Sequence, residues 1–200
     1  TFDAPNPELQ HIDMWREGGA VYTAIQQILE RYPNRMKKLI RVSQAVSDTE
    51  NLHTTVLSLL WYHIFTIEDS EAKLGGIAFD NTETWYYGTG RFFEDWILNR
   101  KIERISGDRD AIQEVRGHYE TTGELKAPLV MMHTTGDPIQ TFWLQQPVYR
   151  LKTISTGAWP LFSAIPIDRY GHCAFEPQEM LLGFVALVLK VEGRELIASL

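Results

Sequence analysis

Two segments in the last third of the chain carry residue types that can move a proton together. In MHTTGDP, Asp137 follows a short apolar run, and in RYGHCAF, His172 lies in a glycine-containing stretch. A carboxylate that pairs with an imidazole holds the ring in one tautomer and stabilises the imidazolium formed during proton transfer. Asp137 and His172 are therefore candidates for the acid and the base of a catalytic site.

The pattern around these two residues predicts alternating strands and helices. Short apolar runs bounded by proline and glycine are typical of buried parallel strands. Parallel sheets carry their active sites at the carboxyl ends of the strands, so we expect Asp137 and His172 to meet there. The expected elements are a strand over 127–133, a helix over 140–153, a strand over 159–167 and a final helix that begins near residue 176.

The earlier part of the chain predicts helices and loops, which gives two regions of different character. Residues 1–120 form a mainly helical region and residues 121–200 an α/β region, so the fold class is α/β. The expected helices cover 9–31, 35–46, 49–67, 91–99 and 108–119, and a loop covers 71–90.

Residues 126–191 resemble the C-terminal part of an α/β-hydrolase. PLVMMHTTGDPI resembles the strand and turn that carry the acid of that family, and AIPIDRYGHCAFEPQE resembles its histidine loop. The resemblance implies that Asp137 is the triad acid, that His172 is the base, and that residues 1–120 correspond to a helical cap. It also implies a small ester or acyl substrate and neither a metal nor an organic cofactor.

The chain departs from that family at the nucleophile. No serine lies in the G-x-S-x-G elbow that the family uses: Ser155 lies in TISTG and Ser106 in RISGD. Cys173 lies in GHCAF, which lacks the second glycine, directly beside the presumed base, where we expect its geometry to be wrong for attack and the residue to be a small buried filler. The leading interpretation is part of a serine α/β-hydrolase that supplies acid and base and is inactive alone. The alternatives are a non-catalytic α/β-hydrolase-like binding or interaction module, and a helical binding domain with coincidental motifs, so enzyme activity stays open.

Three aromatic residues and one further histidine are candidates for secondary roles. Trp85, Tyr86 and Tyr87 lie in a glycine-flanked loop, where they are less easily explained as core residues, and we expect them to line a substrate pocket. His133, on the first expected strand, is expected to pack or to form a local hydrogen bond.

Composition excludes several classes of protein. The chain has 200 residues, 44% of them hydrophobic and 22% charged, which is typical of a globular protein. A net charge of −7 without a long basic run argues against a nucleic-acid partner. A single cysteine excludes an intrachain disulfide framework. The longest apolar stretch, residues 56–67, falls short of the roughly 20 residues that a membrane span needs. None of this fixes the compartment.

Two apolar strands without earlier strands predict a partner. A two-stranded sheet does not cover itself, and its unpaired edges are costly when buried. The chain also begins at Thr1 rather than at methionine. We therefore expect this sheet to pair with the missing N-terminal half of the same protein, retained as a separate polypeptide, or with a second copy of the chain.

Overall fold

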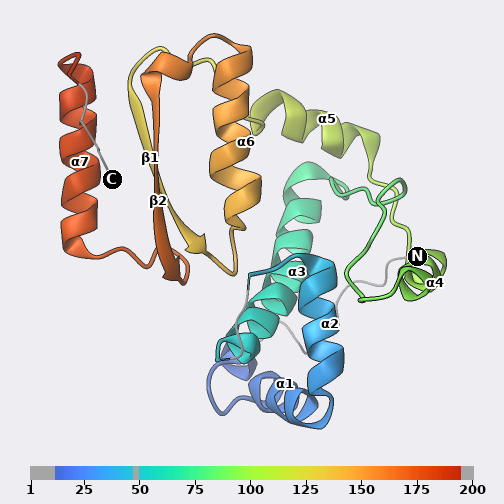
Figure 1. The fold of residues 1–200 in the computed structure, drawn as a ribbon. Coiled ribbons are helices and arrows are strands. Elements are labelled where there is room, and N and C mark those ends of the chain that lie inside the picture. Colours follow the sequence, from blue (N-terminus) through green and yellow to red (C-terminus); the bar gives the residue numbers. More distant parts are fainter. Residues whose placement is uncertain (1–11, 47–49, 195–200) are drawn as a thin grey trace. The chain divides into compact units, whose positions relative to one another are not determined.

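The computed structural model describes residues 12–46 and 50–194. The chain divides into two compact units, Thr1–Glu120 and Thr121–Leu200. The described part of the first unit is helix and loop, and the second contains a two-stranded parallel sheet with helices (Figure 1). The protein is thus a mixed α/β chain, mostly helical, with its small sheet in the C-terminal part.

The helices and strands follow one another in the expected order. The first unit contains the 3-10 helix η2 (Ile12–Trp15) and the helices α1 (Ala20–Arg31), α2 (Pro33–Ser43), α3 (Leu52–Leu74), α4 (Phe92–Lys101) and α5 (Arg109–His118). The second unit contains β1 (Leu129–Gly136), α6 (Phe142–Ser155), η3 (Trp159–Leu161), β2 (Phe162–Tyr170) and α7 (Pro177–Val191).

The largest differences from the expected helix boundaries lie in the first and the third helix. The helix expected over 9–31 is broken between η2 and α1, where Gly18 has a φ of +81° that a helix does not allow; residues 9–11 lie outside the described residues. Helix α3 continues to Leu74, so the expected start of a loop at residue 71 is wrong. An ion pair of Lys73 with Asp69, one turn earlier, stabilises this last part of α3.

Both strands end later than expected, which brings them up to the candidate residues. β1 ends at Gly136 instead of residue 133, and β2 ends at Tyr170 instead of residue 167. β2 also begins at Phe162 rather than at residue 159, because Trp159–Leu161, with proline at its centre, forms the 3-10 turn η3.

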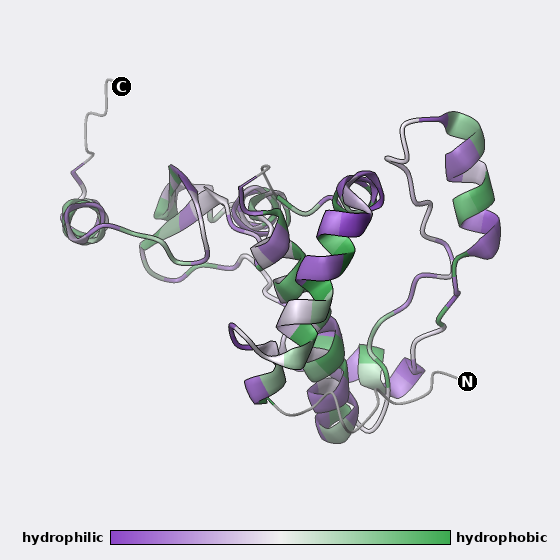
Figure 2. Ribbon diagram, turned by 90° about the horizontal axis from the view of Figure 1, so that it is seen from below, coloured by the Kyte–Doolittle hydropathy of each residue, from purple (hydrophilic) through white to green (hydrophobic). Residues whose placement is uncertain are grey.

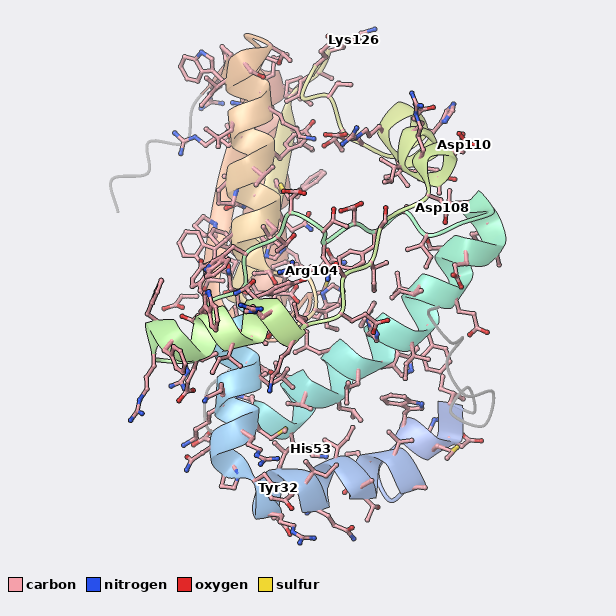
Figure 3. All side chains as sticks on the ribbon, turned by 90° about the vertical axis from the view of Figure 1, so that its right-hand side faces the viewer. Tyr32, His53, Arg104, Asp108, Asp110 and Lys126 are labelled. Atoms are coloured by element: carbon pink, nitrogen blue, oxygen red, sulfur yellow. The ribbon has the colours of Figure 1, made fainter. Side chains whose placement is uncertain are left out.

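The first unit is held together by an apolar core between α1, α2 and α3. Trp15, Ile25, Ile40 and Val56 are buried there. Hydrophobic and hydrophilic residues both occur along the helices (Figure 2), as expected for helices that bury one face. His53 joins α3 to α1, since its Nε2 lies 3.2 Å from the carbonyl oxygen of Tyr22 (Figure 3).

The second unit is a three-layer arrangement of helix, sheet and helix. β1 and β2 pair in parallel, from Leu129 opposite Phe162 to Thr134 opposite Ile167, which confirms the expected parallel pairing. The register then shifts, and Gly136 lies opposite Tyr170. Helices α6 and α7 lie on opposite faces of this pair (Figure 1). The polypeptide therefore leaves both strands at the same edge of the sheet.

Gly136 is required by the close approach of the two strands at this shift. A Cβ atom at this position would lie 2.8 Å from Cα of Tyr170 and 2.9 Å from the carbonyl oxygen of Arg169. Both contacts are with backbone atoms, which cannot rotate away as a flexible side chain can. We expect Gly136→Ala to lower the free energy of unfolding by about 1–3 kcal/mol, measured by chemical denaturation.

The matched control for this substitution is Gly117→Ala on α5. No heavy atom lies within 4 Å of a Cβ at Gly117, so alanine there is expected to leave stability unchanged or to raise it by up to about 1 kcal/mol. Equal stability of the two variants would contradict the steric role of Gly136.

Candidate active site

The carboxyl ends of β1 and β2 bring the two candidate residues together. Asp137 directly follows β1, and His172 follows β2 after one glycine. The backbone N–H of Gly171 donates to the carbonyl of Gly136 at 3.1 Å, and the hydroxyl of Thr134 donates to the carbonyl of Gly171 at 2.6 Å. These bonds tie the loop after β2 to the end of β1, so the two side chains start from neighbouring backbone positions.

Asp137 is buried and fully engaged by hydrogen-bond donors. It is 2% exposed. Its Oδ1 accepts from the backbone N–H groups of Ile139 and Gln140, both at 2.8 Å, and its Oδ2 lies 2.8 Å from Nδ1 of His172. The expected pairing of Asp137 with His172 is confirmed.

The pairing leaves His172 with one ring nitrogen, Nε2, that is not bound to the carboxylate. A carboxylate only accepts hydrogen bonds, so Nδ1 carries the donated proton and Nε2 carries the lone pair of the neutral ring. The side chain of His172 is 41% exposed, in contrast to that of Asp137. This arrangement can take a proton at Nε2 from a nucleophile that approaches the exposed side of the ring, while Asp137 stabilises the imidazolium.

Cys173 is not the buried filler expected from the sequence. The residue is exposed, and its Sγ lies 3.7 Å from Nε2 of His172. Its φ of +51° places it in the left-handed region that non-glycine residues rarely adopt. Adjacent residues in an extended strand point apart, which is why we expected the geometry to be wrong for attack. This turn instead brings the side chains of His172 and Cys173 to the same side.

A cavity of about 230 Å³ opens beside the pair. His133, which is 9% exposed, lines it from β1. Its Nδ1 lies 2.9 Å from the carbonyl oxygen of Thr134, which confirms the local hydrogen bond expected for it. The cavity is lined by Met132, His133, Thr134, Asp137, Gln140, Gln145, His172, Cys173 and Phe175.

Arg169 fixes the loop that carries His172, and sequence reasoning missed it. Its guanidinium donates to both carboxylate oxygens of Glu179 at 2.7 and 3.0 Å, to Glu176 at 3.0 Å, and to the carbonyl of Ala174 at 2.7 Å. The spacing of two glutamates in EPQE at the start of α7 is the signal that predicts a partner for a nearby arginine. The loop is thus clamped on both sides of His172.

The aromatic residues expected in a substrate pocket belong to the first unit. Tyr86 is tied into the loop between α3 and α4, because its backbone N–H donates to Asn99 and its hydroxyl accepts from Asn81. Arg104, labelled in Figure 3, holds the same loop through the carbonyls of Asn81 and Thr84. Trp85 and Tyr87 are about half exposed, at 52% and 54%. Their role in binding stays a prediction.

No metal centre and no membrane span is found among the described residues. Within 12–46 and 50–194, no three His, Cys, Asp or Glu side chains gather in a group that could hold a metal ion. In the same residues, none of the helices combines the length and the hydrophobicity that a bilayer span requires.

Comparisons with models of protein families, with curated proteins and with solved structures yield no match to this chain. The resemblance to α/β-hydrolases thus rests on the residues and the geometry described above.

Asp137→Asn is predicted to change the tautomer of His172 without opening the turn. The amide oxygen of asparagine still accepts from Ile139 and Gln140, but its N–H₂ group faces Nδ1 of the ring. The imidazole proton is then expected to move from Nδ1 to Nε2, which long-range ¹H–¹⁵N NMR measures directly.

The matched variant Asp137→Ala removes the acceptor of both backbone N–H groups. We expect it to lower the free energy of unfolding by about 2–3 kcal/mol, well beyond the effect of the asparagine variant. An unchanged tautomer in Asp137→Asn would contradict the assignment of the proton to Nδ1.

The contact of Arg169 with Glu179 predicts a dependence of stability on pH. The side-chain hydrogen bond from Arg169, and then the backbone N–H of Glu176, hold the pKa of Glu179 below its ordinary value of 4.5. The stability that the carboxylate contributes is therefore present above about pH 4.5 and is lost as the pH falls through the lower pKa of the folded state. The excess stability of the wild type over Glu179→Gln, measured by urea denaturation, should be largest at neutral pH and vanish in acid.

The control for this prediction is the same substitution in an Arg169→Gln background. In that background the pKa of Glu179 loses the main cause of its depression. The free energy of unfolding of Arg169→Gln should therefore differ from that of Arg169→Gln/Glu179→Gln by an amount that depends much less on pH. The same pH dependence with and without Arg169 would show that another group is responsible.

Proposed function

We propose that this chain supplies the acid and the base of a serine α/β-hydrolase that cleaves esters or related acyl bonds. The observation that carries the proposal is the bond between buried Asp137 and half-exposed His172 at the carboxyl ends of two parallel strands. In the complete site, Nε2 of His172 takes the proton of a serine as its oxygen attacks the acyl carbon, and returns it to the leaving group. Asp137 orients the ring and stabilises the imidazolium.

The edge of β2 supports its place at the end of a larger sheet. Pro166 lies in the middle of β2, opposite His133. Proline has no N–H to donate to a neighbouring strand, so within sheets it is confined to edge strands, with its nitrogen on the unpaired side. A further strand is thus disfavoured beside β2, and additional strands of the proposed sheet pair with β1.

The helices of the second unit carry apolar side chains that this unit does not cover. On α7, exposed apolar residues cover a broad part of the helix surface, including the consecutive positions 180–182, which the two strands do not bury. The exposed large apolar residues are Trp143, Leu144, Val148, Leu151 and Ile154 on α6 and Met180, Leu181, Leu182, Phe184, Val185, Val188 and Val191 on α7. A wider sheet joined at β1 places further strands between these helices and covers part of this surface.

The nucleophile of the proposed enzyme comes from the polypeptide that supplies those strands. The described serines lie outside the glycine-flanked turn that exposes a nucleophile in this family. We favour the N-terminal half of the same protein, retained as a separate polypeptide, over a second copy of the chain, because a second copy brings no serine elbow. The helical unit 1–120 then corresponds to the cap region of that family, and the substrate is an ester or a related acyl compound.

The test is to purify the chain under native conditions with whatever polypeptide accompanies it. A fluorophosphonate probe should label a serine of the accompanying polypeptide, and the complex should hydrolyse a p-nitrophenyl ester, whereas the isolated chain shows no sustained turnover. His172→Ala should reduce labelling and hydrolysis by about 10³-fold or more. His118→Ala, an exposed histidine of α5 paired with Glu114, is the matched control and should leave both unchanged.

Two outcomes would count against the enzyme. A well-folded monomer of 23.0 kDa without an accompanying polypeptide would remove the need for further strands. A stable complex whose serines do not react with the probe would favour the alternative function, a non-catalytic α/β-hydrolase-like binding module.

A further inference from the structure

The thiol of Cys173 and the free nitrogen of His172 face each other in the second unit. Sγ lies 3.7 Å from Nε2, within the range of a hydrogen bond to sulfur, and Nδ1 of the same ring lies 2.8 Å from Asp137. A nucleophile, a base and an orienting acid are therefore in contact one after another, from Cys173 through His172 to Asp137, within one polypeptide. This is the order of contacts found in sites where a histidine activates a cysteine.

A second imidazole in the same cavity points independently to a ligand. His133 is 9% exposed, and its Nδ1 is taken by the carbonyl of Thr134. Its Nε2 has no hydrogen-bond partner among the described residues, yet the residue lines the cavity that contains His172 and Cys173. Because Nδ1 is the donor, Nε2 is an acceptor that is available to an N–H or O–H group of a bound molecule.

We propose that Cys173 is an acyl-accepting nucleophile, served by His172 and Asp137, for small activated acyl compounds that carry an N–H or O–H group near the acyl carbon. The cavity volume of about 230 Å³ sets the size of the compound. Met132 and Phe175 in its lining provide apolar contacts, and His133 receives the donor group. This function shares its base with the proposed hydrolase but requires no serine and no second polypeptide.

The acyl transfer is balanced without any further reactant. Nε2 of His172 takes the thiol proton as Sγ of Cys173 forms a bond to the acyl carbon. The bond from that carbon to the leaving oxygen then breaks, and the imidazolium returns the proton to the departing alkoxide or phenolate. The products are a thioester on Cys173 and the free alcohol or phenol. Asp137 keeps the ring in the tautomer that this transfer needs.

The experiment follows the acylation of the full chain by intact-mass and peptide mass spectrometry. The probes are the p-nitrophenyl esters of acetic acid and of N-acetylglycine, of which only the second carries an N–H donor. We expect one acyl group per chain, on Cys173, formed about 10-fold or more faster than on an exposed cysteine without a base. Relative to N-acetylcysteine, which corrects for the reactivity of each ester, the chain should prefer the N-acetylglycyl ester.

The matched control is the double variant Cys173→Ala/Ser155→Cys, which carries its one cysteine at an exposed position of α6. His172→Ala and Asp137→Asn should slow acylation of Cys173 towards the rate of this control. His133→Phe, with its fold checked by circular dichroism, should abolish the preference for the N-acetylglycyl ester.

Each alternative result overturns a defined part of the proposal. If the wild type reacts no faster than the control, or if His172→Ala reacts as fast as the wild type, the thiol is not served by the base. If the wild type shows no preference between the esters, His133 does not receive the donor. The serine-labelling test of the proposed hydrolase is independent of all of these rates, so the failure of one proposal is distinguishable from that of the other.

Discussion

A buried carboxylate costs free energy unless hydrogen-bond donors surround it, and the turn after β1 supplies them to Asp137. Two backbone N–H groups donate to one oxygen and the imidazole of His172 lies against the other. The two backbone bonds fix the path from β1 into α6, and the third bond fixes the ring that follows β2. The carboxylate of Asp137 thus joins the turn after β1 to the histidine loop and sets the tautomer of His172.

The sheet is the other constraint on this site. A parallel pair brings two carboxyl ends to the same edge, but two strands leave most of the surface of α6 and α7 uncovered. Pro166 has no N–H to donate to a further strand beside β2. The edge that can pair with a further strand is therefore that of β1. The pair of Asp137 and His172 is therefore held by a two-stranded sheet, and the further strands that we propose would join this sheet at β1.

The sequence predicts the order of elements in the second unit and the meeting of Asp137 with His172, because both follow from local pattern and from the geometry of parallel strands. Its errors lie where tertiary contacts extend an element, as in the last residues of both strands, or where a turn sets the direction of a side chain. Cys173 was expected to be buried because cysteine is small and apolar, but its positive φ turns it towards Nε2 of His172. The clamp of Arg169 was missed because its glutamate partners lie seven and ten residues away.

His172 offers one lone pair, and this sets the relation between the two proposed activities. The nitrogen that takes a proton from a serine is the same nitrogen that faces the thiol of Cys173, so the ring serves only one nucleophile at a time. A serine supplied by a further strand reaches Nε2 from a rigid sheet, whereas Cys173 reaches it from the histidine loop itself. An acyl group on Cys173 would lie beside Nε2 and keep another nucleophile away from it. In a complete hydrolase, acylation of Cys173 and use of the serine are therefore mutually exclusive states of the same base.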